Sequence, residues 1–239
     1  MHDSAWGRLI AVLVSPSRTF ESIAARPTWA VAMIVLVVLS AASGVLAWQR
    51  VDAEQMAQGT REAMIKQGQE PSAEQLERIA GFQRGFGLGC SVVIPPVAYL
   101  LSALVLMAAL KLAGGEIGFP ASLAVTLHGM MPWAVAALLT VPVVLAQQSI
   151  DFHLLQAGIL LASSAAAFVP PDTNPVLLAV LSSLDVFSFW TIALLTIGFA
   201  IVAKVSRGKA AATVIASWLV WVAVKIALAW VGTAFGGGG

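Results

Sequence analysis

The sequence predicts an all-α fold, a polytopic membrane helical bundle of about five transmembrane helices, and three observations support this class. Hydrophobic residues make up 59% of the 239 residues and charged residues only 10%, whereas soluble domains carry roughly 25% charged residues. The mean hydropathy is +0.89. The apolar residues gather in nearly uncharged runs of about 20 residues or more, a length that spans the ~30 Å hydrocarbon core of a bilayer.

Residues 1–28 precede the first long run and predict two short interfacial helices. Charged residues interrupt this stretch too often for a span, but its apolar residues recur at helical spacing from Trp6 onward. Ser15 and Pro16 are typical of an N-cap followed by the first residue of a second helix. We therefore expect both helices to lie in the headgroup layer, with their arginines outward and with Trp6 and Phe20 facing the apolar interior.

Five apolar runs are long enough to cross the bilayer, and they cover residues 29–48, 86–112, 119–146, 176–203 and 210–231. Prolines lie inside the second and third runs, so we expect these two helices to be kinked and to face the bundle interior or a cavity rather than lipid. Residues 29–235 are predicted to form one domain. The terminal glycines 236–239 are interpreted as a cloning remnant outside it.

A polar insert over residues 50–85 predicts a helical hairpin in water, on the extracytoplasmic side. It contains five of the 13 Lys and Arg residues and six of the 12 Asp and Glu residues. Glu74 and Arg78 stand four residues apart and predict an ion pair on one helix face. Ser72 and Gln75 predict a capping box at the start of the second helix of the hairpin.

The segment 147–175 carries no Lys or Arg, and its apolar part over residues 154–168 is too short to span easily. We interpret this part as an interfacial or re-entrant helix that ends at Pro170 and Pro171. The count of five spans depends on its not crossing the bilayer.

The cations beside the spans predict a cytoplasmic amino terminus. This orientation places seven cations inside: Arg8, Arg18, Arg26, Lys111, Lys204, Arg207 and Lys209. The cation-free segment 147–175 then lies outside. The five cations of the polar insert count against this orientation. The prediction therefore depends on the absence of cations from segment 147–175 and on the basic link between the last two spans.

Asp185 and Lys225 lie inside the fourth and fifth predicted spans, where an unpartnered charge is costly. Measured along the helices from the basic link that joins the two spans, they stand roughly 28 and 24 Å away at the helical rise. This shared depth predicts an intramembrane charge pair. The pair is either structural, with Lys225 extending toward the membrane surface, or an ion or proton site.

A polar cavity is a further prediction, with four residues as its candidates: His128, Pro132, Pro95 and Ser188. His128 lacks carboxylate or thiol neighbours at ligand spacing, and the single Cys90 excludes a cysteine cluster, so no metal site is expected. The sequence contains no HExxH motif, no phosphate-binding glycine loop and no Gly-x-Ser-x-Gly motif. We therefore expect neither an enzyme nor a cofactor. A formal charge of +1 gives no indication of nucleic-acid binding.

Several degenerate motifs together resemble the bacterial branch of the Yip family, named for Ypt/Rab-interacting membrane proteins. The residues that carry the resemblance are Pro16, Phe20, Trp29, Trp190, Lys204, Arg207 and Lys209, with Asp185 before Trp190. The resemblance implies five spans, a cytoplasmic amino terminus and location in the bacterial inner (cytoplasmic) membrane. The Asp-Leu-Tyr-Gly-Pro and Gly-Tyr-Ser motifs of eukaryotic members are absent, so Rab binding is not carried over.

Two functions remain open at this point. The first is a non-catalytic accessory or scaffold subunit for a membrane transport, export or membrane-organisation system. Its partners would be the lipid bilayer, a membrane protein such as the ABC-type exporters to which the resemblance points, or a second copy of the chain. The alternative is a small transporter or channel that uses Asp185, Lys225 and His128.

Overall fold

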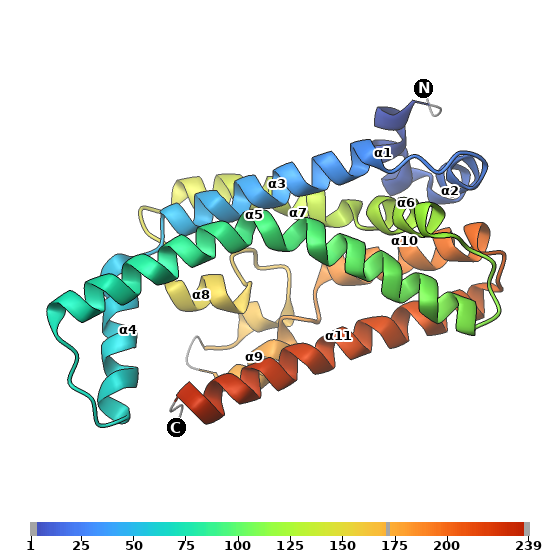
Figure 1. Ribbon diagram of the computed structural model, residues 1–239. Coiled ribbons are helices and arrows are strands. Elements are labelled where there is room, and N and C mark those ends of the chain that lie inside the picture. Colours follow the sequence, from blue (N-terminus) through green and yellow to red (C-terminus); the bar gives the residue numbers. More distant parts are fainter. Residues whose placement is uncertain (1–3, 171–172, 237–239) are drawn as a thin grey trace. The chain divides into compact units, whose positions relative to one another are not determined.

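The structure is a computed structural model that describes residues 4–170 and 173–236 (Figure 1). Its elements are α1 (Ala5–Val14), α2 (Pro16–Ala25), α3 (Ala30–Gln49), α4 (Ala53–Lys66), α5 (Ala73–Leu112), α6 (Phe119–Gly129), α7 (Met131–Ala146), α8 (Phe152–Ala157), the 3₁₀-helix η1 (Ala165–Phe168), α9 (Pro175–Leu181), α10 (Val186–Val202) and α11 (Arg207–Gly236). Residues 237–239 of the predicted glycine tail lie outside the described residues.

Helices of membrane-spanning length dominate the described part of the chain. Four segments are long and apolar enough to cross a bilayer: Ala30–Gln49, Ala73–Leu112, Phe119–Ala146 and Arg207–Gly232. Shorter apolar helices are α1 and α10. No strand occurs within residues 4–170 and 173–236. The predicted class, an all-α polytopic membrane bundle, is confirmed.

The chain forms two compact units. Unit 1 contains residues 1–41, 93–138 and 186–221, and unit 2 contains residues 42–92, 139–185 and 222–239. Helices α3, α5, α7 and α11 contribute residues to both units. The two amino-terminal helices belong to unit 1 and the polar insert to unit 2.

Unit 1 has a core in which α2, α6 and α10 pack against one another (Figure 1). Phe20, Leu127 and Phe199 are fully buried there. A Cβ atom at Gly198 would lie 2.7 Å from both the ring of Phe20 and the side chain of Val125. The absence of a side chain at Gly198 therefore lets α2 and α6 approach α10 closely, as small residues do between membrane helices.

The two predicted amino-terminal helices are confirmed as α1 and α2, but the predicted directions of their side chains are partly wrong. Arg8 is only 5% exposed, which contradicts the outward direction predicted for the arginines, whereas Trp6 is 64% exposed from the protein and its contact with the membrane interior stays a prediction. Arg8 faces inward because its Nη1 atom donates hydrogen bonds, each 2.9 Å long, to the carbonyl of Arg26 and the hydroxyl of Thr28. Phe20 is buried as expected, but it lies in the protein core rather than against lipid.

Helix α5 differs from the prediction of a hairpin helix followed by a separate span at residue 86. It is one helix of 40 residues that begins in the polar insert and continues through Pro95 and Pro96 (Figure 1). The predicted capping box does start it, since the amide of Ser72 donates to Gln75 Oε1 at 2.9 Å and the amide of Gln75 donates to Ser72 Oγ at 3.2 Å. After this start, α5 continues past residue 86, where the sequence predicted the boundary between the hairpin helix and the span.

The predicted third span is interrupted at Met130, which separates α6 from α7. Pro132 is the second residue of α7, where a missing amide hydrogen is tolerated because that group has no partner within the helix. The interruption therefore precedes this proline, while Pro142 lies inside α7 without ending it.

The predicted helix over residues 154–168 is wrong. Only α8, with six residues, and the four-residue η1 are helical there. Gly158 ends α8 in a left-handed conformation with φ of 69°, which favours glycine. No helix in the described part of this segment reaches the length of about 20 residues that a span needs. Pro171 lies outside the described residues.

Candidate functional site

The predicted fourth span, residues 176–203, is not one helix. It is broken into α9 and α10 by a linker over residues 182–185. Asn174 caps α9 by accepting hydrogen bonds from the amides of Val176 and Leu177. At the other end, the hydroxyls of Ser182 and Ser183 donate to the carbonyl of Ala179 at 3.3 and 2.7 Å. These serine bonds satisfy the carboxyl end of α9 locally, so the helix stops inside an apolar sequence.

Lys225 reaches this break from α11. Its ammonium donates hydrogen bonds to Ser182 Oγ at 3.0 Å and Ser183 Oγ at 3.1 Å. Lys225 is half-buried, and the carboxylate of Asp185 acts on its charge electrostatically. The structure therefore brings the two residues predicted as a charge pair to one place, within unit 2.

Asp185 is the last residue of the linker and is 5% exposed. Ser163 donates a short hydrogen bond to its Oδ2 atom. The backbones of Ser164 and Asp185 form an antiparallel bridge, and the amide of Ala165 donates to the carbonyl of Leu184 at 3.1 Å. The segment that precedes η1 thus covers the helix break.

We call the set formed by Ser163, Ser164, Ser182, Ser183, Asp185 and Lys225 the break cluster. Its charges match the helix ends beside them, because the cation lies at the carboxyl end of α9 and the anion directly precedes the amino end of α10. Helices interrupted inside the membrane form ion and substrate sites in this way. The hypothesis of an ion site at Asp185 and Lys225 stays a prediction.

The break cluster is not arranged for nucleophilic catalysis by a Ser–Lys pair. A lysine that activates a serine must be neutral and accept the hydroxyl proton. Here Lys225 donates to both serines, and the hydroxyl of Ser183 is donated to the carbonyl of Ala179.

The four residues of the predicted polar cavity all belong to unit 1. His128 is 2% exposed and its Nδ1 atom lies 2.8 Å from the carbonyl of Ala124 in the same helix. Ser188 is 8% exposed on α10. Pro132 and Pro95 lie in α7 and α5. The existence of a cavity at these residues stays a prediction.

The residues that carry the family resemblance have structural places in unit 1. Pro16 begins α2, Phe20 fills the core, and Lys204 adopts a left-handed conformation with φ of 54° after α10. Lys209 donates to the carbonyl of Ala113 at 3.3 Å, just beyond the end of α5. The remaining members are Trp29, which is 41% exposed, Trp190, which packs on the core, and Arg207, which begins α11.

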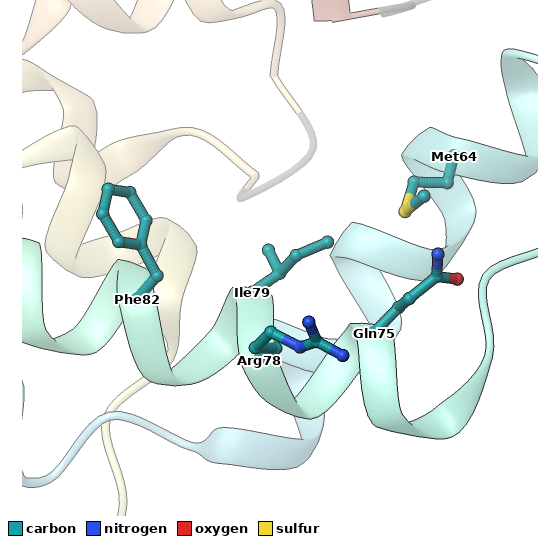
Figure 2. A pocket seen from close by; sticks show the side chains of 5 residues that line it. All are labelled: Met64, Gln75, Arg78, Ile79 and Phe82. Carbon is teal, nitrogen blue, oxygen red and sulfur yellow. The ribbon is translucent and has the colours of Figure 1, made fainter.

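A shallow groove lies between α4 and α5 in the polar insert. Figure 2 shows the side chains that line it, from Met64 on α4 and from Gln75, Arg78, Ile79 and Phe82 on α5. Arg78 forms the predicted ion pair with Glu74 at 2.8 Å on the exposed helix surface. The groove offers apolar contact but no set of converging reactive groups.

Two arginines of the insert have roles that the sequence reasoning missed. Arg50 Nη1 donates to the carbonyls of Val144, Leu145 and Gln147, at 3.3, 3.2 and 2.7 Å. Arg84 donates to the carbonyl of Gln49 at 2.8 Å. Both therefore cap the carboxyl ends of membrane helices, α7 and α3. Their position directly beside a span was the one signal that could have indicated this role.

Ser163 and Ser164 were also missed, as was the inward Arg8. The two serines lie far from Asp185 in sequence and belong to a segment that was expected to be helical, so no spacing rule connected them. For Arg8 a signal existed, because it stands four residues before Val12 and so shares a face with it. Because α1 has apolar residues on both of its faces, the sequence did not show which face is covered by the bundle.

These features define the class of the protein: a polytopic helical membrane protein with two amino-terminal helices built into its bundle. The family model of the Yip1 domain matches residues 10–237. The chain therefore belongs to the Yip family of membrane proteins, as the resemblance indicated. Members of this family are generally non-enzymatic. No curated protein and no solved structure matches the chain.

Within the described ranges, no group of three or more His, Cys, Asp or Glu side chains is placed to hold a metal ion. The prediction that the protein works without metal or cofactor stays a prediction.

Proposed function

We propose that this Yip-family protein is a non-catalytic scaffold that organises the membrane by holding α1 in one leaflet. The observation that carries the proposal is the outer face of α1, formed by Trp6, Ile10 and Val14. These side chains are 64%, 72% and 74% exposed, and their spacing of four residues puts them on one side of the helix. An apolar face of this kind on a membrane protein finds its partner at the boundary between headgroups and acyl chains.

The inner face of α1 fixes the helix to the bundle. Leu9 and Val12 belong to the core of unit 1, and Arg8 binds the chain between α2 and α3. The outer face therefore has a fixed direction and does not depend on folding at the membrane. A helix that is held in this way adds area to one leaflet only.

The charge distribution supports a cytoplasmic position for the amino terminus and for the basic links. Unit 1 contains seven Lys and Arg against three Asp and Glu, a formal charge of +4, while unit 2 contains six against nine, a formal charge of −3. Exposed Arg18 and Arg26 lie on α2 and directly after it, close in the chain to the outer face of α1. Cations near an apolar helix face strengthen binding to anionic lipids.

The five cations of the polar insert are weaker evidence against this orientation than their number suggests. Two of its five cations, Arg50 and Arg84, are used as caps of helix ends. We therefore propose a cytoplasmic amino terminus, in the inner membrane of a bacterium. An export system as partner has no support among the contacts of the described residues.

Reconstitution into anionic liposomes tests the proposal. The test variant is Trp6→Ala/Ile10→Ala/Val14→Ala, and the matched control is Leu101→Ala/Leu104→Ala/Val105→Ala, three exposed residues of α5. We expect the unaltered protein and the control to reduce vesicle diameter at equal protein density, and the test variant to lose this effect. Equal diameters for all three proteins would contradict the proposal.

Lipid contact of α1 is measured separately. In a Cys90→Ala background, a fluorophore on Ile10→Cys should be quenched by brominated lipids, whereas a fluorophore on Arg61→Cys in the polar insert should not. Deletion of residues 1–26 is unsuitable as a test, because it removes Phe20 and Ile23 from the core.

The sequence also predicted a transporter as the alternative. The structure places Asp185 and Lys225 in the break cluster of unit 2 and His128 in the core of unit 1, where it is hydrogen-bonded within its own helix. Of these two places, the break cluster has the composition of an ion site.

A further inference from the structure

We propose that the break cluster is a binding site for a small monovalent cation, Na⁺ being the probe, and that Lys225 occupies it in this structure as a tethered cation. The proposal goes beyond the scaffold function and does not depend on it. It follows from three observations: the set of oxygen ligands, the burial of Asp185, and the half-buried position of Lys225.

The cluster presents only hard oxygen ligands. The hydroxyl of Ser163 donates to the carboxylate of Asp185, and the hydroxyls of Ser182 and Ser183 accept from Lys225. Ser164 joins them through the bridge between its backbone and that of Asp185. Carboxylate, hydroxyl and carbonyl oxygens are the ligands that alkali and alkaline-earth cations prefer over nitrogen or sulfur. One carboxylate among neutral hydroxyls suits a single positive charge, which is the charge that an ammonium or Na⁺ supplies.

The hydroxyl of Ser164 is an independent indication of a ligand. Ser164 is 5% exposed, and its Oγ atom is buried without a hydrogen-bond partner. Its backbone is bridged directly to that of Asp185. A buried hydroxyl that lacks a partner costs free energy unless a ligand satisfies it, and a cation beside Asp185 would give it one.

Asp185 requires a compensating cation. Its residue is 5% exposed, so its carboxylate has lost most of its contact with solvent. A buried carboxylate is stable only when it is paired and hydrogen-bonded. Ser163 supplies one hydrogen bond to its Oδ2 atom, and a nearby positive charge compensates the negative charge.

Lys225 can supply that charge and can also give it up. Its ammonium donates hydrogen bonds to two neutral hydroxyls, at 3.0 and 3.1 Å. The side chain is half-buried, and long lysine side chains extend to the polar surface of a membrane when their charge is not needed inside. Exchange of the ammonium for Na⁺ leaves the cluster with one positive and one negative charge.

The main experiment removes the ammonium of Lys225 and measures the unfolding temperature of the full chain in detergent. In Lys225→Met we expect the unfolding temperature to be higher in NaCl than in choline chloride at the same concentration. The rise should be about 3 °C or more when Na⁺ exceeds its Kd by roughly tenfold. In Asp185→Asn/Lys225→Met the two salts should give the same temperature. Identical unfolding of Lys225→Met in both salts would overturn the proposal.

A second experiment keeps Lys225 in place and covers the case in which Lys225→Met does not fold. In a Cys90→Ala background, Leu184→Cys puts a thiol in the linker at a residue that is 41% exposed and is not a ligand. We expect NaCl, compared with choline chloride, to change the rate of its alkylation by about twofold or more, and Asp185→Asn to abolish the difference. Equal alkylation rates in the two salts with Asp185 present would show that Lys225 has a structural role only and that no cation binds.

Discussion

The Nη1 atom of Arg8 lies 2.9 Å from the hydroxyl of Thr28, and this bond connects the first helix to the residue just before the first membrane span. The same atom donates to the carbonyl of Arg26. One buried guanidinium therefore holds α1, the end of α2 and the start of the bundle together. The outer face of α1 owes its fixed direction to this contact.

Loss of the Arg8 contact should loosen the amino-terminal helices. Arg8→Met leaves the Arg26 carbonyl and the Thr28 hydroxyl without this donor, at a cost of about 1.5–3 kcal/mol for hydrogen bonds to a charged group. We expect a lower unfolding temperature and faster hydrogen exchange in α1 and α2. Arg18→Met, at an exposed position of α2, is the control and should change neither. Unchanged exchange in Arg8→Met would show that apolar packing alone holds α1.

The contact between Phe20 and Gly198 predicts a size limit on α10. Gly198→Ala brings a Cβ atom to 2.7 Å from the ring and from Val125, and overpacking of this kind costs about 1–3 kcal/mol. Gly208→Ala on α11, where nothing lies within 4 Å, should be neutral. Phe20→Leu should recover part of the stability lost in Gly198→Ala. Additive losses in the double variant, measured by thermal unfolding, would contradict direct contact.

Arg50 is predicted to stabilise the carboxyl end of α7 by capping its carbonyls. Arg50→Met leaves three carbonyls without their charged donor. We expect faster hydrogen exchange and easier proteolysis in residues 144–151, with little change in unit 1. Arg61→Met, an exposed cation of α4, should leave the digestion pattern as it is. A pattern that is the same in Arg50→Met would mean that the backbone bonds around Ile150 are sufficient.

Ser40 and Tyr99 connect α3 and α5 through a 2.9 Å hydrogen bond between their hydroxyls. Hydrogen bonds between membrane helices contribute about 0.6 kcal/mol on average and at most about 1.7. A double-mutant cycle of Ser40→Ala and Tyr99→Phe should give a coupling energy in this range. A coupling near zero would show that the two groups find other partners when the bond is absent.

Local features of the polar insert were predictable from the sequence because they depend on residues three or four apart. The Ser72–Gln75 capping box and the Glu74–Arg78 ion pair are both confirmed. The prediction failed for the end of the same helix. The sequence placed a boundary near residue 86, but α5 continues, since nothing in its local chemistry requires a break.

The candidate site was predictable only in part. Helical rise placed Asp185 and Lys225 at a similar depth, and the structure brings both into the break cluster. The break itself was not foreseen, because residues 176–203 are apolar enough for an uninterrupted span. Ser163 and Ser164 complete the cluster from a segment whose helix was wrongly predicted.

The sequence by itself determined that this chain is a helical membrane protein of the Yip family, that two short helices precede the first span, and which charges lie within the apolar runs. Composition, hydrophobic run length and short-range capping carry that information, because each depends on neighbouring residues. The tertiary structure decided that Arg8 faces inward, that Trp6, Ile10 and Val14 face outward, and that Ser163 and Ser164 contact Asp185 from a segment distant in sequence. Those outcomes depend on which side of a helix another element covers, and an apolar helix without a polar stripe does not encode its covered side in its own sequence.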